Sequence, residues 1–585
     1  MDRFFLRALV RELAPQLLGR RVRGIKRGGD GGFVILLGAR RGTDLIVSLS
    51  PHAPGLYVGR PPTSADDSSQ HSRLKKLLTG SELVGIEAAA LDRVVTLTWK
   101  LAKPSGVTRT MELVLEWPGT RTAAFLVDSG TREVLDVVSP GTPRMVPGEV
   151  FRALPPSPES WEVAATREEF LERLPASAGE TSTQTQIVRA ASGLSPQLAE
   201  EVVALASGSR ISTEEAFEQV VARLGDPPRP VLLSPENRAF HQKGYRLIIS
   251  PIPLSPRDNW GSRSFATCNE AAGAFIAESR RLDAARGSYI EAVGKLRTQL
   301  KKTRKLDARL KGELEGLRQP DELRRWGEIL LAGLQQARRM DDGVIVPDPY
   351  QEGAPSVRVP IDPRLDLTGN ARRYFERARK AVRSRERLEA RLAKTSEELD
   401  HLETLELAFE DLVDMETLAA LVEELRETGI LSAPRSRGVG SGAKDKKKES
   451  GQPLEPRRFR LSSGAVALAG RSARSNEQLT FRIAQPEDLW FHAASTPGAH
   501  VVLRVPSGLE ACGEDIEETA AVAAFFSKAR GSTSAEILYT PRKNIRKIPG
   551  APPGTVRVTR FRTVRVRPAL PPAPTKGASR EEGDR

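Results

Sequence analysis

The chain has 585 residues, with 89 Lys or Arg against 75 Asp or Glu and a formal net charge of +14 at pH 7. This length predicts several structural units rather than one hydrophobic core. The charge favours a polyanionic partner, either nucleic acid or an anionic membrane surface. The only two cysteines, Cys268 and Cys512, exclude a disulfide framework and argue against a cysteine-based zinc site. Residues 1–15 predict an amphipathic helix, and neither a secretory segment nor a long uncharged apolar span follows, so we expect a soluble cytoplasmic protein.

The first structural unit is predicted to be β-rich. Between Gly24 and about Val138, short apolar runs alternate with polar residues and turn signals, which indicates an antiparallel sheet or sandwich. A Pro-rich stretch, residues 140–158, closes this unit. The strand-like runs are 33–37, 44–49, 94–99, 111–116 and 124–127.

A short helical region follows, starting near residue 166. Residues 187–202 place a Gly-Leu-Ser-Pro turn between two short helices, which is typical of a helix-hairpin-helix. Such a turn can offer backbone N–H groups and a helix N-terminus to a phosphate. The alternative is a glycine-containing turn in a small helical domain, and the pattern alone leaves both open.

Two long heptad segments predict an antiparallel coiled coil. In the first, residues 269–317, Phe275, Leu282, Tyr289 and Leu296 fall seven apart. The second runs from Ala371 to about Leu425 with the same periodicity. Between them, a helix over 321–340 and a hairpin over 343–346 and 356–360 predict a compact tip. At ~1.5 Å per residue an arm of roughly 45 residues spans about 70 Å; the alternative is the core of a helical bundle.

The C-terminal part is predicted to be a separate α+β domain. Residues 435–456 are rich in Gly, Ser and Lys and indicate a flexible linker, and the tail after Leu570 is predicted to be disordered. The expected secondary structure is strands at 465–468, 479–483, 500–504, 535–539 and 555–558, with one helix over 517–529.

A strongly basic segment lies at the end of this domain. Residues 541–570 hold nine Arg or Lys and no acid, beginning with Arg542, Lys543, Arg546 and Lys547 and ending in the alternating run 560–567. Alternation in a strand places pairs of arginines on one face, where they can follow a phosphate backbone. A solvated charged strand is the alternative, but unpaired charges at this density repel one another, which favours phosphate binding.

Aromatic and imidazole rings gather near Trp490. Asp488-Leu-Trp-Phe-His492 is followed shortly by His500. Two histidines without a third ligand argue against a metal, so the imidazoles are expected to form hydrogen bonds, stack on bases or fix the loop, and Trp490 can equally belong to the core. Elsewhere no catalytic constellation, phosphate loop or metal-ligand spacing occurs, so we expect no enzyme activity, metal or cofactor.

Taken together, these segments resemble the NFACT family, the RqcH, FbpA and NEMF proteins of ribosome-associated quality control, over nearly the whole chain. The matching motifs are 1–13, 85–97, 359–365, 370–375, 470–480, 488–492, 497–501 and 526–530. The resemblance implies a multidomain α+β fold. Its parts would be an NFACT-N domain at 1–180 with a return segment at 227–268, an inserted helix-hairpin-helix at 181–226, an antiparallel coiled coil with a small tip domain at 269–430, a flexible linker at 431–456, an NFACT-R RNA-binding domain at 457–568 and a disordered tail at 569–585.

The resemblance also implies a function and its residues. The family binds large ribosomal subunits obstructed by peptidyl-tRNA and recruits tRNA, in bacteria alanyl-tRNA, so that an alanine tail grows on the stalled chain, and the ribosome does the chemistry. Asp92, Arg93 and Glu116 match its tRNA contacts. After Glu116 this chain has Trp117-Pro118 where two apolar residues, often Leu-Met, are usual in the family it resembles, a departure next to the expected tRNA site. The expected RNA-binding residues of the C-terminal domain are Arg471, Arg474, Trp490, His492, His500, Lys528, Arg530, Arg542, Lys543, Arg546 and Lys547.

Other functions remain open. The N-terminal unit of this family is akin to formamidopyrimidine-type DNA glycosylases, but those use an N-terminal Pro-Glu pair and usually a zinc finger, where this chain has Asp2-Arg3 and two cysteines. Some relatives were described as fibronectin-binding, so an adhesin, or fibronectin binding as a secondary property, is a second alternative. The third is a general RNA chaperone. No membrane partner and no obligate homo-oligomer are expected.

Overall fold

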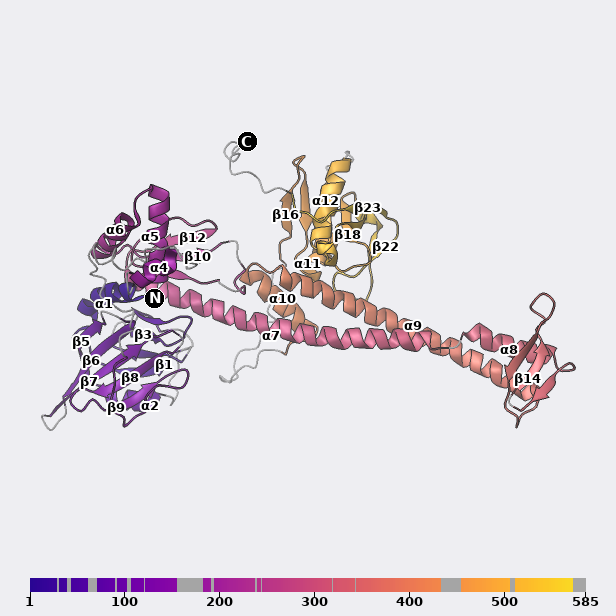
Figure 1. Ribbon diagram of the computed structural model, residues 1–585, viewed down its shortest axis with the longest axis horizontal. Helices are drawn as coiled ribbons and strands as arrows, with labels where there is room; N and C mark the ends of the chain where they lie inside the picture. Colours follow the sequence, from indigo (N-terminus) through magenta and orange to yellow (C-terminus); the bar gives the residue numbers. More distant parts are fainter. Residues whose placement is uncertain are drawn as a thin grey trace. The chain divides into compact units, whose positions relative to one another are not determined.

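The computed structural model describes residues 1–28, 31–38, 44–61, 71–89, 92–102, 107–119, 121–154, 183–190, 194–236, 239–242, 245–317, 319–341, 343–432, 454–505 and 511–571. The chain divides into two compact units, Met1–Gly287 and Ser288–Arg585. Each unit is described by itself (Figure 1). No helix in these ranges is long and apolar enough to cross a membrane.

Two antiparallel sheets form the larger part of the first unit, and the predicted β-rich region is confirmed. The strand order is β1-β2-β3-β4 in one sheet and β5-β6-β7-β8-β9 in the other. The five strand-like runs of the sequence become β2, β3, β6, β7 and β8. The bounds are β1 (Gly24–Arg27), β2 (Phe33–Leu36), β3 (Asp44–Ser48), β4 (Gly55–Gly59), β5 (Glu82–Ala88), β6 (Val94–Ala102), β7 (Thr108–Glu116), β8 (Ala123–Asp128) and β9 (Val134–Val138).

Helix α1 (Arg3–Leu17) packs on the core of these sheets. Asp2 caps its N-terminus, with Oδ1 accepting a hydrogen bond from the Phe5 amide at 2.9 Å. Its buried residues recur at helical spacing and join one cluster with Trp99 and Trp117. A short helix, α2 (Ser72–Leu78), adds Leu74 to the same cluster.

A helical subdomain follows in the first unit. It contains α4 (Thr183–Ala190), α5 (Pro196–Ser209) and α6 (Thr213–Gly225), and then a sheet of order β11-β10-β12. The predicted helix-hairpin-helix corresponds to α4 and α5, and residues 191–193 of its turn lie outside the described residues. The bounds of the strands are β10 (Val231–Pro235), β11 (Ile248–Ser250) and β12 (Trp260–Ser264).

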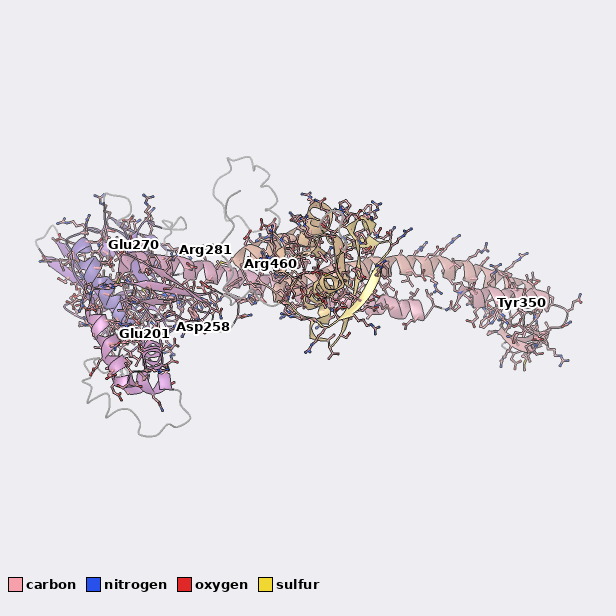
Figure 2. All side chains as sticks on the ribbon, turned by 90° about the horizontal axis from the view of Figure 1, so that it is seen from above. Glu201, Asp258, Glu270, Arg281, Tyr350 and Arg460 are labelled. Carbon is pink, nitrogen blue, oxygen red and sulfur yellow. The ribbon has the colours of Figure 1, made fainter. Side chains whose placement is uncertain are left out.

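Glu201 holds this subdomain together (Figure 2). Its carboxylate is 1% exposed and lies 3.3 Å from Arg223 Nη1 of α6. It also accepts hydrogen bonds from the amide and hydroxyl of Ser255, at 2.6 and 3.0 Å. These donors satisfy the hydrogen-bonding needs of the buried carboxylate, so Glu201 fixes α5 against α6 and the segment after β11.

The long helices α7 (Cys268–Glu315) and α9 (Leu367–Glu410) confirm the predicted coiled coil. Within the second unit they run antiparallel, because Tyr289 packs on Phe409 with ring centroids 6.1 Å apart, whereas Gln319, shortly after α7, accepts a hydrogen bond from Arg385 at 3.0 Å. Figure 1 shows the two helices side by side. The second arm ends at Glu410, so the predicted extension of this arm to about Leu425 is wrong. After residues 411–414 the chain turns back as α10 (Met415–Glu427), and Thr428 lines one pocket with Lys394 and His401 of α9.

The tip between the arms contains one helix and a three-stranded sheet, α8 (Pro320–Ala332) with β13 (Arg338–Met340), β14 (Gly343–Pro347) and β15 (Ser356–Pro360). The hairpin is confirmed, but a helix extending to Met340 is wrong. The helix ends at Gly333, and residues 338–340 pair with β14 instead. Tyr350 lies in the β14–β15 connection with 60% of its surface exposed (Figure 2).

The C-terminal domain, residues 454–571, contains a six-stranded sheet of order β16-β17-β19-β18-β20-β23. Helix α12 (Gly513–Phe525) covers one face. The other face packs on α11 (Ala473–Gln478), the helical turn η2 (Leu479–Ile483) and the ribbon β21–β22. The strands are β16 (Arg457–Arg460), β17 (Val466–Ala469), β18 (Leu489–Ala493), β19 (Val501–Leu503), β20 (Ala535–Pro541), β21 (Ile545–Lys547), β22 (Val556–Val558) and β23 (Arg562–Val566).

One predicted strand of this domain is wrong. Residues 479–483 form a π-helical turn that continues α11, although their apolar alternation is typical of a strand. The turn buries Leu479 in the core and places Thr480 beneath Trp490, whose indole N–H donates a hydrogen bond to Oγ1 at 3.2 Å. Tertiary packing therefore overrides the local pattern.

Candidate nucleic-acid interface

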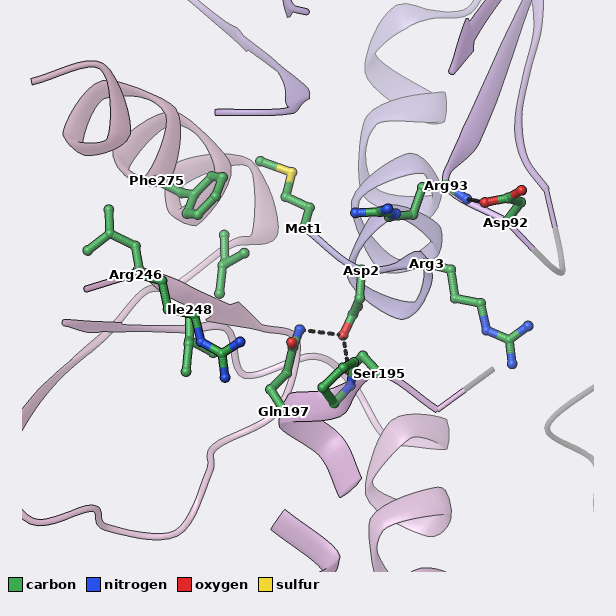
Figure 3. Close-up of a pocket in the computed structure, with 13 residues that line it drawn as sticks. Met1, Asp2, Arg3, Asp92, Arg93, Ser195, Gln197, Arg246, Ile248 and Phe275 are labelled. Atoms are coloured by element: carbon green, nitrogen blue, oxygen red, sulfur yellow. Dashed lines mark hydrogen bonds between the residues drawn. The ribbon is translucent and has the colours of Figure 1, made fainter. Parts of the chain in front are cut away.

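Asp92 and Arg93 lie in the connection between β5 and β6. The Ala89 amide donates to the Val94 carbonyl at 2.8 Å and closes the end of this hairpin. The Asp92 carboxylate accepts a hydrogen bond from the Arg93 amide at 2.7 Å, which fixes the backbone of the turn. Both side chains are half-buried, and in Figure 3 they extend in different directions.

A cavity of about 460 Å³ lies beside this turn within the first unit. Asp2 fixes its floor, because Oδ2 accepts hydrogen bonds from Ser195 Oγ at 2.7 Å and from Gln197 Nε2 at 2.9 Å (Figure 3). These bonds join α1 to the start of α5. The cavity therefore lies where the β5–β6 turn, α1 and the helix-hairpin-helix meet, lined by Met1, Asp2, Arg3, Asp92, Arg93, Ser195, Pro196, Gln197, Arg246, Leu247, Ile248, Ile249 and Phe275.

The lining of this cavity combines cationic and apolar groups. Arg93 and Arg246 contribute guanidinium groups and Phe275 of α7 contributes an aromatic ring, whereas the Arg3 side chain extends away from them in Figure 3. Arginine binds phosphates through two parallel hydrogen bonds and also stacks on bases. A nucleotide of a folded RNA therefore matches the chemistry of this site.

Glu116 is the last residue of β7 and lies opposite Val94 of β6 in the antiparallel register. Its side chain is 2% exposed and does not line the cavity. Arg144 forms a two-pronged ion pair with it, with Nε–Oε2 and Nη2–Oε1 distances of 3.0 and 2.6 Å. The Arg144 guanidinium also lies 5.1 Å from the ring centroid of Phe125. The structure therefore brings Asp92 and Arg93 together at the cavity and places Glu116 beneath them, next to their strand.

Trp117, where the chain departs from the family pattern, is a core residue. It is 1% exposed, its indole N–H donates to the Ser48 carbonyl at 2.8 Å, and its amide donates to the Arg93 carbonyl at 3.0 Å. Through its indole and its backbone amide, Trp117 thus connects the end of β3 to the turn that carries Arg93. This departure changes the support of the turn rather than the lining of the cavity.

Trp490, His492 and His500 form one ring cluster in the C-terminal domain. The Trp490 and His492 rings are stacked with centroids 5.6 Å apart and planes 10° apart, because both side chains extend from the same face of β18. His500 meets Trp490 edge-on at 4.9 Å. Thr480 connects them, since its Oγ1 accepts from Trp490 and lies 2.8 Å from His500 Nδ1. Trp490 itself is buried in the core.

Both histidines of the cluster are held neutral. Burial lowers the pKa of His492 to about 4, and burial together with the neighbouring His492 lowers the pKa of His500 well below its ordinary value. With the Trp490 N–H already donated to Thr480, the hydroxyl proton of Thr480 can be donated to His500 Nδ1. At neutral pH these rings act as hydrogen-bonding and stacking groups and not as cations.

Four of the predicted RNA-binding residues form ion pairs with the coiled coil. Arg530 lies 2.8 Å from Asp411 at the end of α9. The others are paired with acidic residues of α9, α10 and the residue before α10, as Lys528–Glu403, Arg471–Asp414 and Arg474–Glu427. These cations join the C-terminal domain to α9 and α10.

The remaining predicted residues lie near the ribbon β21–β22. Arg542 donates to the Thr480 carbonyl at 2.9 Å, Lys543 pairs with Glu487 at 2.8 Å and Lys547 with Glu477 at 2.5 Å. Arg546 is exposed and lies directly opposite the exposed Arg557 on the neighbouring strand. Like charges opposite one another destabilise a sheet, so this pair is best explained by an anionic partner.

Several residues of these sites were not predicted from the sequence. Ser195, Gln197 and Arg246 come from segments 100 or more residues after the Asp-Arg turn, and no local spacing connects them with it. The Gly-Leu-Ser-Pro turn was the one available signal, because it contains Ser195. In the described ranges no three His, Cys, Asp or Glu side chains are arranged to hold a metal ion.

Comparison with known families accounts for this arrangement. Residues 2–447 match the model of the NFACT N-terminal and middle domains, and residues 456–560 match that of the NFACT protein RNA binding domain. The chain belongs to the NFACT family.

Curated relatives carry one name. The protein called Rqc2 homolog RqcH from Streptococcus pneumoniae is 26% identical over 578 residues, covering 97% of this chain and 98% of the relative. The protein of the same name from Bacillus subtilis is 26% identical over 502 residues, covering 85% and 84%.

Solved structures cover about half of the chain each. The C-terminal part of the fibronectin/fibrinogen-binding protein from Streptococcus suis aligns with a TM-score of 0.36 and 25% identity, over 49% of this chain and 96% of its own. The fibrinogen binding protein from Staphylococcus aureus aligns with a TM-score of 0.38 and 23% identity, over 47% and 98%.

Proposed function

We propose that this protein is a ribosome-associated quality control factor. It binds large ribosomal subunits that are obstructed by peptidyl-tRNA and recruits a tRNA, alanyl-tRNA in the simplest case, for C-terminal tailing of the stalled chain. It works in the cytoplasm and makes no covalent bond itself, since the ribosome transfers the peptide. Family membership and the names of the curated relatives support a role in ribosome-associated quality control.

One observation carries the tRNA part of the proposal. Asp92 and Arg93 occur at the edge of an arginine-lined cavity that also includes the start of the helix-hairpin-helix. Two guanidinium groups, those of Arg93 and Arg246, beside apolar side chains suit an RNA nucleotide that combines phosphate and base. The basic ribbon with Arg546 and Arg557 supports rRNA binding by the C-terminal domain.

The test is the RNA that co-purifies with the tagged protein. Wild type should be enriched in large-subunit rRNA and one tRNA family, and Arg93→Ala should lose the tRNA while keeping the rRNA. Arg11→Ala is the matched control, because Arg11 is an exposed arginine of α1 outside the cavity lining. Unchanged tRNA with Arg93→Ala would defeat the site assignment, and even coverage of cellular RNA would favour a general RNA chaperone.

A further inference from the structure

A second cavity, of about 450 Å³, lies within the second unit. One wall is the outer face of β18 with His492, and the opposite wall is helix α9 with His401. Its volume lies within the range of about 300–1,000 Å³ that is usual for small-ligand sites. Neither His401 nor most of this lining belongs to the sites described above.

His401 is the unusual member of the lining. It is 6% exposed, and neither ring nitrogen has a hydrogen-bond partner of good geometry. Burial lowers its pKa, although the Pro553 carbonyl and the Glu398 carboxylate oppose the shift. With the Pro553 carbonyl nearby but no hydrogen bond of good geometry at either nitrogen, the buried imidazole costs free energy unless a ligand supplies a partner. Thr496 Oγ1, also in the lining, is likewise buried without a partner.

The loop that carries Thr496 is held in a fixed shape. Ser495 has a positive φ of 57°, which is uncommon for a residue other than glycine. Gly498 packs so closely on Ser527 that an added Cβ would lie 2.8 Å from the Ser527 Cβ. Backbone strain of this kind gathers at binding sites.

The chemistry of the lining selects one class of ligand. No lysine or arginine lines the cavity, so a phosphate does not fit. The walls offer aromatic and proline rings for stacking, and imidazole, hydroxyl and amide groups together with the Asp400 carboxyl group for hydrogen bonds. A flat, uncharged heteroaromatic ring with donors and acceptors on its edge satisfies both, and in an RNA-binding domain that ring is a nucleobase.

The surroundings also suit a polynucleotide chain. Val556 and Val558 of β22 line the cavity, and Arg557 between them faces the opposite side of the strand beside Arg546. The cavity and this pair of arginines therefore lie on opposite sides of one short strand.

We propose that this cavity binds one unpaired nucleobase of an RNA, stacked near the His492 ring and read at its edge by His401 and Thr496. The proposal rests on the RNA-binding role proposed above and adds a single-nucleotide site to it.

The experiment compares two single-stranded RNAs of about eight nucleotides with the full-length protein, one with bases and one with abasic riboses throughout. Fluorescence anisotropy gives both dissociation constants. Wild type should bind the base-bearing RNA about 10-fold or more tightly. His401→Leu should remove most of this preference, whereas Thr395→Val, an isosteric change at a buried α9 residue outside the lining, should retain it.

A second variant covers the case in which His401→Leu does not fold. Ser396→Phe fills the cavity from a half-buried position of α9 and should also remove the base preference. Equal binding of the two RNAs by wild type, or a full preference in a folded Ser396→Phe protein, would overturn the proposal. If the wild-type protein shows no base preference but still sediments with large ribosomal subunits, the base site alone is refuted. If it shows neither the base preference nor co-sedimentation, the ribosomal role is refuted as well.

Discussion

Arg530 of the C-terminal domain donates a hydrogen bond to Asp411 at the end of α9, with Nη1 2.8 Å from Oδ1, and its guanidinium lies 3.9 Å from the Phe525 ring centroid. A residue that resemblance assigns to RNA binding is thus engaged with the coiled coil. Carboxylates and phosphates accept the same hydrogen bonds from arginine. An RNA backbone bound by these cations would therefore compete with the acidic residues of α9 and α10.

The ion pair of Lys528 with Glu403 should hold the C-terminal domain on α9. Lys528→Met should destabilise this contact by about 1–3 kcal/mol, because Glu403 is 9% exposed and would lose a charged partner. A double-mutant cycle with Glu403→Gln, measured by urea unfolding, gives the coupling. Additive effects of the two changes would show that the pair contributes nothing.

Glu403 also predicts a loss of this contact in acid. Burial would raise its pKa, but hydrogen bonds from Lys528 and Arg304 outweigh burial, and the pKa is lowered. A lowered pKa stabilises the folded form above the ordinary value of 4.5, and this stability is lost as the pH falls below it. The protection factors of residues 526–531, that is, exchange rates relative to the intrinsic rate at each pH, should fall in that range in wild type and less so in Glu403→Gln.

Glu424 of α10 predicts the opposite pH dependence. Burial raises its pKa to about 7. A hydrogen bond from the Ser472 side chain and the charge of Arg474 lower the pKa, and the charge of Glu477 raises it. The contribution of protonated Glu424 to the free energy of unfolding is therefore full below pH 4.5, and it is lost as the pH rises to about 7. Glu424→Gln should therefore stabilise the domain at pH 8 by up to about 3 kcal/mol and have little effect at pH 4.5. Glu416→Gln, at an exposed position of the same helix, should change neither value.

Glu116 can be tested for its two possible roles. Because it is buried against Arg144, Glu116→Gln should destabilise the first unit by about 1–3 kcal/mol, and Arg144→Met should do the same. If Glu116 also contacts tRNA, Glu116→Gln will lose co-purified tRNA at a temperature where the folded fraction is complete, and Arg144→Met will not. Equal tRNA recovery by both variants would leave Glu116 with a structural role alone.

The pair Arg546 and Arg557 should report phosphate binding. Arg546→Ala should weaken rRNA binding and reduce the slope of log K against log salt by about 1, since one phosphate contact is lost. It should also raise the thermal stability of the free protein slightly, because two like charges no longer face each other. An unchanged salt slope would exclude Arg546 from the interface.

The periodicity of the sequence predicted the helices and strands of this fold better than it predicted their tertiary contacts. The heptads located both arms, and the alternation of residues 94–99 and 111–116 located β6 and β7, because these patterns are set by burial along one face. The π-helical turn at 479–483 was missed, since Thr480 is fixed by Trp490 and His500 rather than by its neighbours. His401 was not predicted either, as a histidine on a heptad helix gives no sign of the domain that covers it.

The indole of Trp117 has a consequence for how this chain can change. It fills the core and donates to the Ser48 carbonyl, so a smaller aliphatic residue at this position would leave a void and remove this donor. Such a loss is about 3–5 kcal/mol when a large aromatic residue is truncated in a core. A smaller residue at position 117 would therefore need compensating changes among its neighbours to keep the core filled.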